Sequence, residues 1–153
     1  MEKAAELLRL EDIPCSAHTI QLAVNDALLV HRCVSDVIGK ARRIVEHLKH
    51  SPHARDKLKM IQIGHGLKQH LLIQDEPTRW NSAFYMLQQF LEQKTALITY
   101  LSEMEGLPNL DQNDWKIIES TLAILQPLEE FTKKVSLIHR ICLHSSYPIE
   151  FQE

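Results

Sequence analysis

The sequence predicts a mainly α-helical fold, an irregular helical bundle with at most one short strand near residues 12–16. Only 4 of the 153 residues are glycine, whereas residues that favour helices, such as Leu, Ala, Glu, Lys and Gln, are plentiful. Apolar residues recur at helical spacing in several segments. A chain of this length can bury one core and remove roughly 70% of its unfolded surface from water.

The first two helices follow a short extended entry. Pro14 disfavours helical geometry at the residue before it, which permits the short strand. Apolar residues share one helical face from about residue 17 to residue 29. A second helix is predicted from a cap at Ser35 or Asp36 to about His50.

A third helix is predicted to begin at Pro52, with Ser51 as its cap, and to end near Gly64 or Gly66. Proline suits the first helical position because its missing N–H would have no partner there. Residues 64–77 show no periodicity and are expected to form a loop.

The fourth predicted helix has the clearest pattern, with Thr78 or Asn81 as its cap and a 3.6-residue period that continues up to Gly106. After a turn, Asn109 or Asp111 is expected to cap a last helix. Pro127 lies inside this helix and is expected to kink it, because proline removes one backbone donor.

The periodic pattern decays after about residue 136. The sequence therefore predicts three parts: an N-terminal segment (1–9), a central helical region (10–136) and a poorly ordered C-terminal tail (137–153).

Charge is distributed unevenly along the chain. Residues 1–79 contain 12 Lys/Arg and 10 Asp/Glu, whereas residues 80–153 contain 5 and 10. The whole chain is therefore not a simple basic nucleic-acid binder. Three cysteines are an odd number and indicate a reducing compartment. No apolar segment approaches the roughly 20 residues that span a bilayer, so no membrane partner is predicted.

Two short motifs carry the most information. One is Cys15-Ser16-Ala17-His18-Thr19-Ile20-Gln21-Leu22-Ala23-Val24, and the other is Thr78-Arg79-Trp80-Asn81-Ser82. In this order and at this spacing they resemble the hAT-superfamily transposases and the host proteins descended from them, including zinc finger BED domain-containing proteins. The resemblance covers roughly residues 10–136 and implies the helical insertion of an RNase H-like transposase domain.

The resemblance also implies a function. It indicates a transposon-derived protein of the nucleus that binds DNA or regulates transcription. In the family, two catalytic Asp residues precede the first motif and the catalytic Glu follows the helical insertion, so no catalytic residue and no enzymatic activity are expected here. The residues themselves agree, because the acids are scattered and two-metal chemistry needs several converging carboxylates. No cofactor is predicted.

Trp80 and Arg79 are the first candidates for DNA contact. The polar neighbours of Trp80 set it apart from a usual core aromatic, although a core position at a helix start remains the alternative. The resemblance implies that Trp80 stacks on an unpaired base, which is worth about 1–3 kcal/mol per base. Arg79 would then bind a phosphate.

A basic stretch between residues 40 and 59 is the second candidate. It holds seven Lys or Arg residues and only two acidic residues. Such a stretch could bind a phosphate backbone, or it could form two solvated helix faces. The residues assigned to DNA contact in this stretch are Lys40, Arg42, Arg43 and Lys49.

Cys15 and His18 are expected to have a structural role, as a small buried residue and a hydrogen-bonding residue at the helix start. A zinc site is the alternative, with His31 and Cys33 as the second pair of ligands. A continuous helix between the two pairs would tend to hold them apart. No metal site is therefore assigned.

Two other functions remain open. One is a helical protein–protein interaction module, which would form homo- or hetero-oligomers through exposed apolar seams on the fourth helix (84–101) and the last helix (115–131). The other is a small zinc-stabilised domain.

Overall fold

The computed structural model describes residues 16–145, with side chains described for residues 19–27 and 30–134. Within that range the chain forms six helices and no strand, which confirms the mainly α fold. The strand predicted near residues 12–16 lies outside the described residues, except that Ser16 begins a helix. The helices are α2 (Ser16–Val30), α3 (Arg32–His50), α4 (Pro52–Gly64), α5 (Trp80–Glu92), α6 (Lys94–Ser102) and α7 (Gln112–Ser145).

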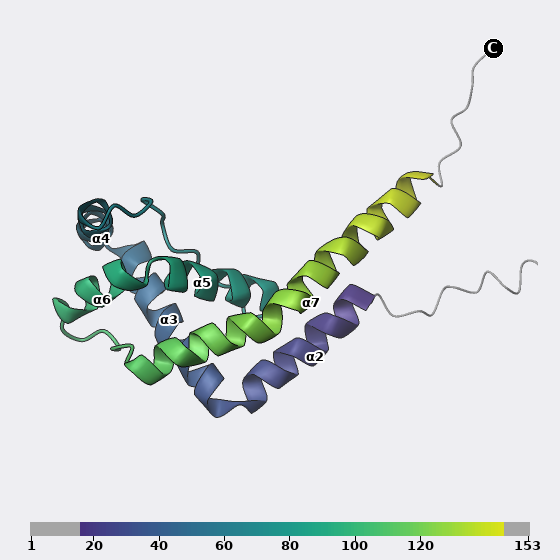
Figure 1. Ribbon diagram of the computed structural model, residues 1–153, viewed down its shortest axis with the longest axis horizontal. Helices are drawn as coiled ribbons and strands as arrows, with labels where there is room; N and C mark the ends of the chain where they lie inside the picture. Colours follow the sequence, from purple (N-terminus) through teal and green to yellow (C-terminus); the bar gives the residue numbers. More distant parts are fainter. Residues whose placement is uncertain (1–15, 146–153) are drawn as a thin grey trace, which may run out of the picture.

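Four helices form the centre of the bundle. Each of α2, α3, α5 and α7 contacts the other three. Helices α4 and α6 pack on each other at one end of the bundle, where α4 follows α3 and α6 follows α5 (Figure 1). The long helix α7 lies along the bundle and then extends beyond it (Figure 1).

Helix α3 supplies one side of the core. Its apolar residues recur every three or four positions, so they share one face, and that face is buried. The largest fully buried side chains from the other helices include Trp80 and Phe90 of α5, Tyr100 of α6 and Ile118 of α7. The buried residues of α3 are Val37, Ile38, Ala41, Ile44, Val45 and Leu48.

The start of α3 differs from the prediction. The helix begins at Arg32, and neither Ser35 nor Asp36 caps it. The amides of Val34 and Ser35 donate to the carbonyl of His31 at 2.9 and 3.0 Å, so the first turn forms from backbone bonds alone. Ser51 does cap α4 as predicted, since its Oγ accepts from the amide of Ala54 at 3.2 Å.

The fourth predicted helix is interrupted. It begins at Trp80 with no side-chain cap from Arg79, so neither Thr78 nor Asn81 has the predicted capping role. It then breaks at Gln93, which separates α5 from α6. The Gln93 side chain is fully buried, and its Nε2 donates to the carbonyl of Lys68 at 3.2 Å. The apolar period alone could not reveal this break, because a contact with the distant 67–76 segment accompanies it.

Helix α7 begins as predicted and ends later. The Asp111 carboxylate accepts from the amide of Asp114 at 2.7 Å, and the Asp114 carboxylate accepts from the amide of Asp111 at 3.0 Å. This reciprocal pair caps the helix. The helix includes Pro127 and continues through residues 137–145, where the aperiodic sequence had predicted a poorly ordered tail. Residues 128–145 contain no proline or glycine to end it.

Tyr100 gives the bundle a predicted sensitivity to alkaline pH. Its side chain is fully buried, its hydroxyl lies 3.1 Å from Nε2 of His47, and burial raises the pKa of the Tyr100 phenol above its usual value. The folded state therefore keeps this proton at a pH where the unfolded chain releases it. This contribution to stability is fully present below the unfolded pKa of about 10 and is lost as pH rises through the folded pKa.

We therefore expect the melting temperature to fall more steeply above about pH 10 in the wild type than in Tyr100→Phe, which cannot ionise. Tyr85→Phe is the matched control because Tyr85 is only half-buried, and it should keep the steep fall of the wild type. Parallel curves for the wild type and Tyr100→Phe would contradict the assignment.

Candidate nucleic-acid interface

The segment that leads into α5 is bound to α3 at two points. Lys49 Nζ donates to Oε1 of Gln74 at 3.0 Å. Two turns away on the same helix, Arg42 binds Asp75, with Nε 2.9 Å from each carboxylate oxygen and Nη2 2.6 Å from Oδ2. The Asp75 side chain is only 1% exposed. A buried carboxylate needs such a partner because its charge has lost most of its hydration.

Helix α2 contacts the same segment, so the two motifs of the sequence lie together. Gln21 Nε2 donates to the carbonyl of Thr78 at 2.6 Å, and Asn25 Nδ2 lies 3.4 Å from the same oxygen. Gln21 belongs to the first motif and Thr78 to the second. Residues more than fifty positions apart therefore share one site.

A tight turn sets the position of Arg79. The Ser82 Oγ accepts from the amide of Glu76 at 2.7 Å and lies 2.6 Å from the Arg79 carbonyl, to which it donates. The Arg79 amide donates to the Glu76 carbonyl at 2.8 Å. The backbone of Arg79 is thus fixed immediately before α5, whereas its side chain is exposed.

Trp80 lies in the hydrophobic core. Only 1% of the residue is exposed, and its ring meets that of Phe84 edge to face, with centroids 6.4 Å apart. The core alternative describes this position. No face of the ring is free to stack on a base in this structure. Its indole N–H has no hydrogen-bond partner among the described residues, so packing holds the ring.

The basic residues of α3 fall into two groups. Lys40 pairs with Asp114 of the α7 cap at 2.7 Å, and Arg42 pairs with Asp75. The charges of Lys40 and Arg42 are therefore largely offset. Arg43 and Lys49 are exposed and form no ion pair among the described residues. Together with Arg79, they are the uncompensated cations among the predicted DNA-contacting residues.

Four residues of this region were not singled out in the sequence. Asp75 and Asp114 carry buried carboxylates, and Gln21 and Asn25 hold the Thr78 carbonyl. A signal was present for the two amides, because each is a polar residue among the apolar positions of the first predicted helix. No local pattern marked the two acids, since their partners are 33 and 74 positions away.

The remaining motif residues are only partly accounted for. Cys15 lies outside the described residues, and His18 belongs to α2 but its side chain is not among those described. His31 and Cys33 are both exposed. Among the described residues, no group of three or more His, Cys, Asp or Glu side chains is placed to hold a metal ion.

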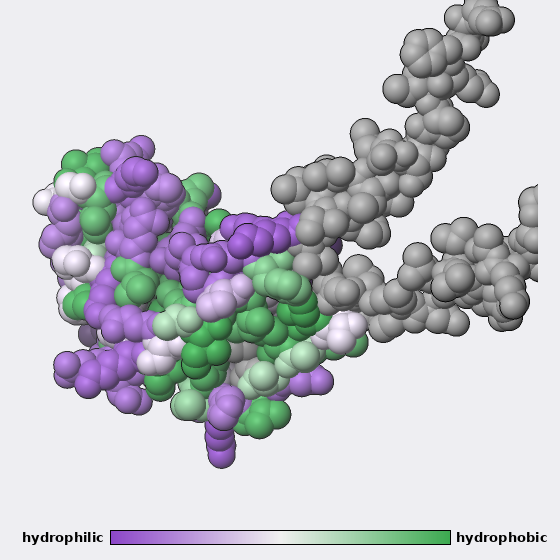
Figure 2. Space-filling model, turned by 45° about the vertical axis from the view of Figure 1, so that its right-hand side comes forward, coloured by the Kyte–Doolittle hydropathy of each residue, from purple (hydrophilic) through white to green (hydrophobic). Residues whose placement is uncertain are grey.

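The apolar seams expected to bind a partner are mostly buried within the bundle. Phe84, Leu87 and Leu97 lie in the core, as do Trp115 and Ile118. Burial within the chain's own core leaves little of either seam free. Some apolar residues do remain exposed, and Figure 2 shows apolar side chains gathered in the middle of one face. The exposed large residues of α2 and α7 are Leu22, Val30, Ile124 and Phe131.

Within residues 16–145, no helix is both long and apolar enough to cross a membrane.

Comparison with known proteins identifies the class of this helical bundle. Residues 13–124, more than half of the chain, match the model of the ZBED1 RNase-like helical domain. The chain therefore belongs to the family of proteins with this domain. The match confirms the resemblance to transposase-derived proteins of the zinc finger BED domain-containing kind. No solved structure matches the chain significantly.

Individual relatives agree with the family. The chain is 33% identical over 124 residues to zinc finger BED domain-containing protein 4 of Homo sapiens, which covers 81% of this chain and 11% of the relative. It is 33% identical over 125 residues to the human zinc finger BED domain-containing protein 6, covering 82% and 13%. A putative transcriptional regulator, tpeD of Talaromyces stipitatus, is 28% identical over 165 residues, covering 90% and 19%. The chain thus spans a small part of each relative's length.

The Arg42–Asp75 pair is predicted to be essential to the site. Arg42→Ala leaves the buried Asp75 carboxylate without its partner, so the free energy of unfolding should fall by about 2 kcal/mol. The neighbouring Arg43→Ala removes an exposed, unpaired cation and should change it by less than about 0.5 kcal/mol. Urea unfolding followed by circular dichroism measures both. Equal stability of the two variants would show that the pair contributes little.

Trp80 is predicted to act through packing. Trp80→Ala should lower the free energy of unfolding by about 3–5 kcal/mol because it empties a large core site. Trp80→Phe keeps an aromatic ring and removes no hydrogen bond, so its loss should be clearly smaller. A Trp80→Ala variant that unfolds at the same urea concentration as the wild type would contradict the core assignment.

Proposed function

We propose that this chain is a helical part of a nuclear, transposon-derived regulatory protein, and that it contacts DNA without catalysing a reaction on it. The single observation that supports DNA contact most strongly is the fixed, solvent-exposed position of Arg79 where the two family motifs meet. The nuclear location and regulatory role rest on the relatives, which include a putative transcriptional regulator.

The electrostatics of the surface favour a phosphate backbone as the ligand. Arg79 precedes the first turn of α5, and no side chain caps that end of the helix. Free amides and the positive end of the helix dipole attract anions. Arg43 and Lys49 add exposed positive charge on α3, the helix that holds the same segment. Lys40 and Arg42 contribute mainly by fixing α7 and the segment before α5.

Trp80 has an indirect part in this proposal. Its buried ring anchors the first turn of α5 in the core, so the neighbouring Arg79 keeps its exposed position. Cys15 and His18 keep the structural role expected from the sequence. No residue is proposed to act as a catalyst or to bind a cofactor.

DNA contact predicts a salt-dependent affinity that depends on three named cations. We expect the full chain to bind fluorescein-labelled hairpin-ended DNA in an anisotropy titration, with an affinity that falls between about 50 and 200 mM salt. The triple variant Arg43→Ala/Lys49→Ala/Arg79→Ala should lower the slope of log K against log salt by about 3, roughly one unit for each phosphate contact.

The matched control is Arg32→Ala/Lys116→Ala/Lys134→Ala. These three residues are also exposed and form no ion pair among the described residues, so the change in net charge is the same. The control should lower the slope by less than about 1. The proposal is rejected if the folded wild type ignores DNA at low salt, or if both variants lose the same affinity.

A further inference from the structure

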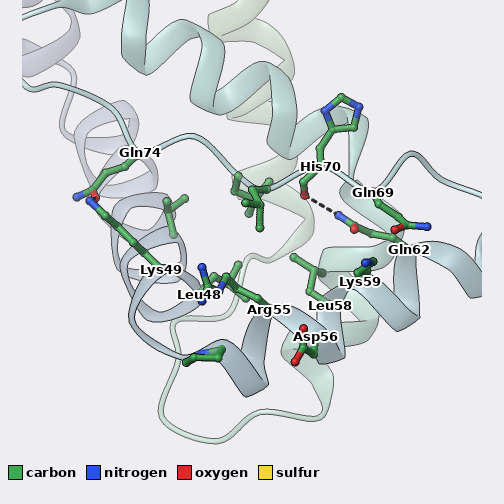
Figure 3. Close-up of a pocket in the computed structure, with 14 residues that line it drawn as sticks. Leu48, Lys49, Arg55, Asp56, Leu58, Lys59, Gln62, Gln69, His70 and Gln74 are labelled. Atoms are coloured by element: carbon green, nitrogen blue, oxygen red, sulfur yellow. Dashed lines mark hydrogen bonds between the residues drawn. The ribbon is translucent and has the colours of Figure 1, made fainter.

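A cleft of about 570 Å³ lies between the end of α3, helix α4 and the irregular 67–76 segment (Figure 3). Lys49 and Gln74 lie at one end of it, and Gln62 and His70 lie at the other (Figure 3). Its volume falls in the range of roughly 300–1,000 Å³ that is usual for ligand pockets. Arg79 does not line this cleft, so the proposed DNA contact leaves it unexplained.

The lining of the cleft is partly apolar. Val45 and Leu48 of α3 and Leu58 of α4 line it and are nearly fully buried, and Leu72 is half-buried. Leu71 also lines the cleft, and 69% of it is exposed. Apolar surface around a hollow of this size favours a ligand with an apolar side chain, because filling the hollow removes both surfaces from water.

The charged residues around the cleft are mostly cationic. Lys49, Arg55 and Lys59 line it, with Asp56 as the single acidic residue. Lys49 donates to a neutral amide, and Arg55 and Lys59 form no ion pair among the described residues. Lys57, which lies between them in the sequence, does pair with Glu103, at 3.0 Å. The cleft therefore has an excess of positive charge that carboxylates on a ligand would complement.

The cleft is already formed in the free chain. Gln62 is almost fully buried, and its Nε2 donates to the carbonyl of His70 at 3.0 Å, which ties the irregular segment to α4 (Figure 3). The Leu67 amide donates to the Gln62 carbonyl at 2.9 Å. A preformed site reduces the entropy that a ligand must lose on binding.

We propose that this cleft binds a short acidic peptide segment of a protein partner, with a leucine-like side chain in the apolar part and Asp or Glu beside Arg55 and Lys59. The lining favours a peptide over nucleic acid. Unpaired bases are usually held by stacking on aromatic rings, and the lining contains no Phe, Tyr or Trp. A phosphate backbone would leave the apolar part unfilled.

The first test uses a displayed library of random octapeptides selected on the immobilised 153-residue chain. The selected pool should be enriched in Asp and Glu next to Leu, Ile or Phe. The most abundant selected peptide is then synthesised with a fluorescent label and titrated against variants. Arg55→Glu/Lys59→Glu should weaken its binding by at least about tenfold, because two attractive charge contacts become repulsive.

Matched controls separate the cleft from the rest of the surface. Lys116→Glu/Lys134→Glu makes the same change in net charge at exposed sites outside the cleft and should leave the affinity within about twofold. Leu71→Ser should weaken binding several-fold, whereas Ile124→Ser, at a similarly exposed apolar residue, should not. Circular dichroism melts confirm that every variant is folded.

Three results would overturn the proposal. One is a selected pool without acidic bias, or a selected peptide that binds Arg55→Glu/Lys59→Glu as tightly as the wild type. Another is DNA that displaces the peptide and loses its own affinity in that variant, which would assign the cleft to nucleic acid. The third is a dimer in light scattering that the same variant abolishes, which would assign it to a second copy. Because the DNA test changes Arg43, Lys49 and Arg79, the two proposals fail independently.

Discussion

The burial of one face of α3 is the constraint on which the rest of the structure depends. This helix contacts α2, α4, α5 and α7, and its apolar side chains lie in the core. Burying these side chains provides a large part of the stabilisation of the bundle. The opposite face of α3 then necessarily points outward, and this is the face that carries Arg43 and Lys49. Packing of the core thus fixes which charges reach solvent.

Buried carboxylates divide the charges of α3 further. Asp75 and Asp114 come from distant parts of the chain, and each has one basic partner on α3. The two pairs hold the segment before α5 and the start of α7 against the same helix. A basic stretch that looks uniform in the sequence therefore has a structural part and an exposed part. Only the exposed part, with Arg79, is suited to bind an anionic ligand.

The second consequence concerns the two family motifs. They meet because α2 and the turn before α5 pack side by side, with side-chain amides of α2 directed at the Thr78 carbonyl. Trp80 and Arg79 are neighbours in the chain but have opposite environments, one in the core and one in solvent. This arrangement explains how a conspicuous Trp can support a surface site without being part of the surface.

The sequence by itself determined the helical class, the family and most of the helices, because amphipathic periodicity and cap residues such as Ser51 and Asp111 act over a few positions. It missed the break at Gln93, the early start of α3 and the extension of α7. It also could not tell that Trp80 is buried or that Lys40 and Arg42 are paired. Only the tertiary structure decided these points, since each depends on contacts between residues far apart in the chain. Local patterns record which residues favour a helix, whereas burial and ion pairing are set by how the helices pack.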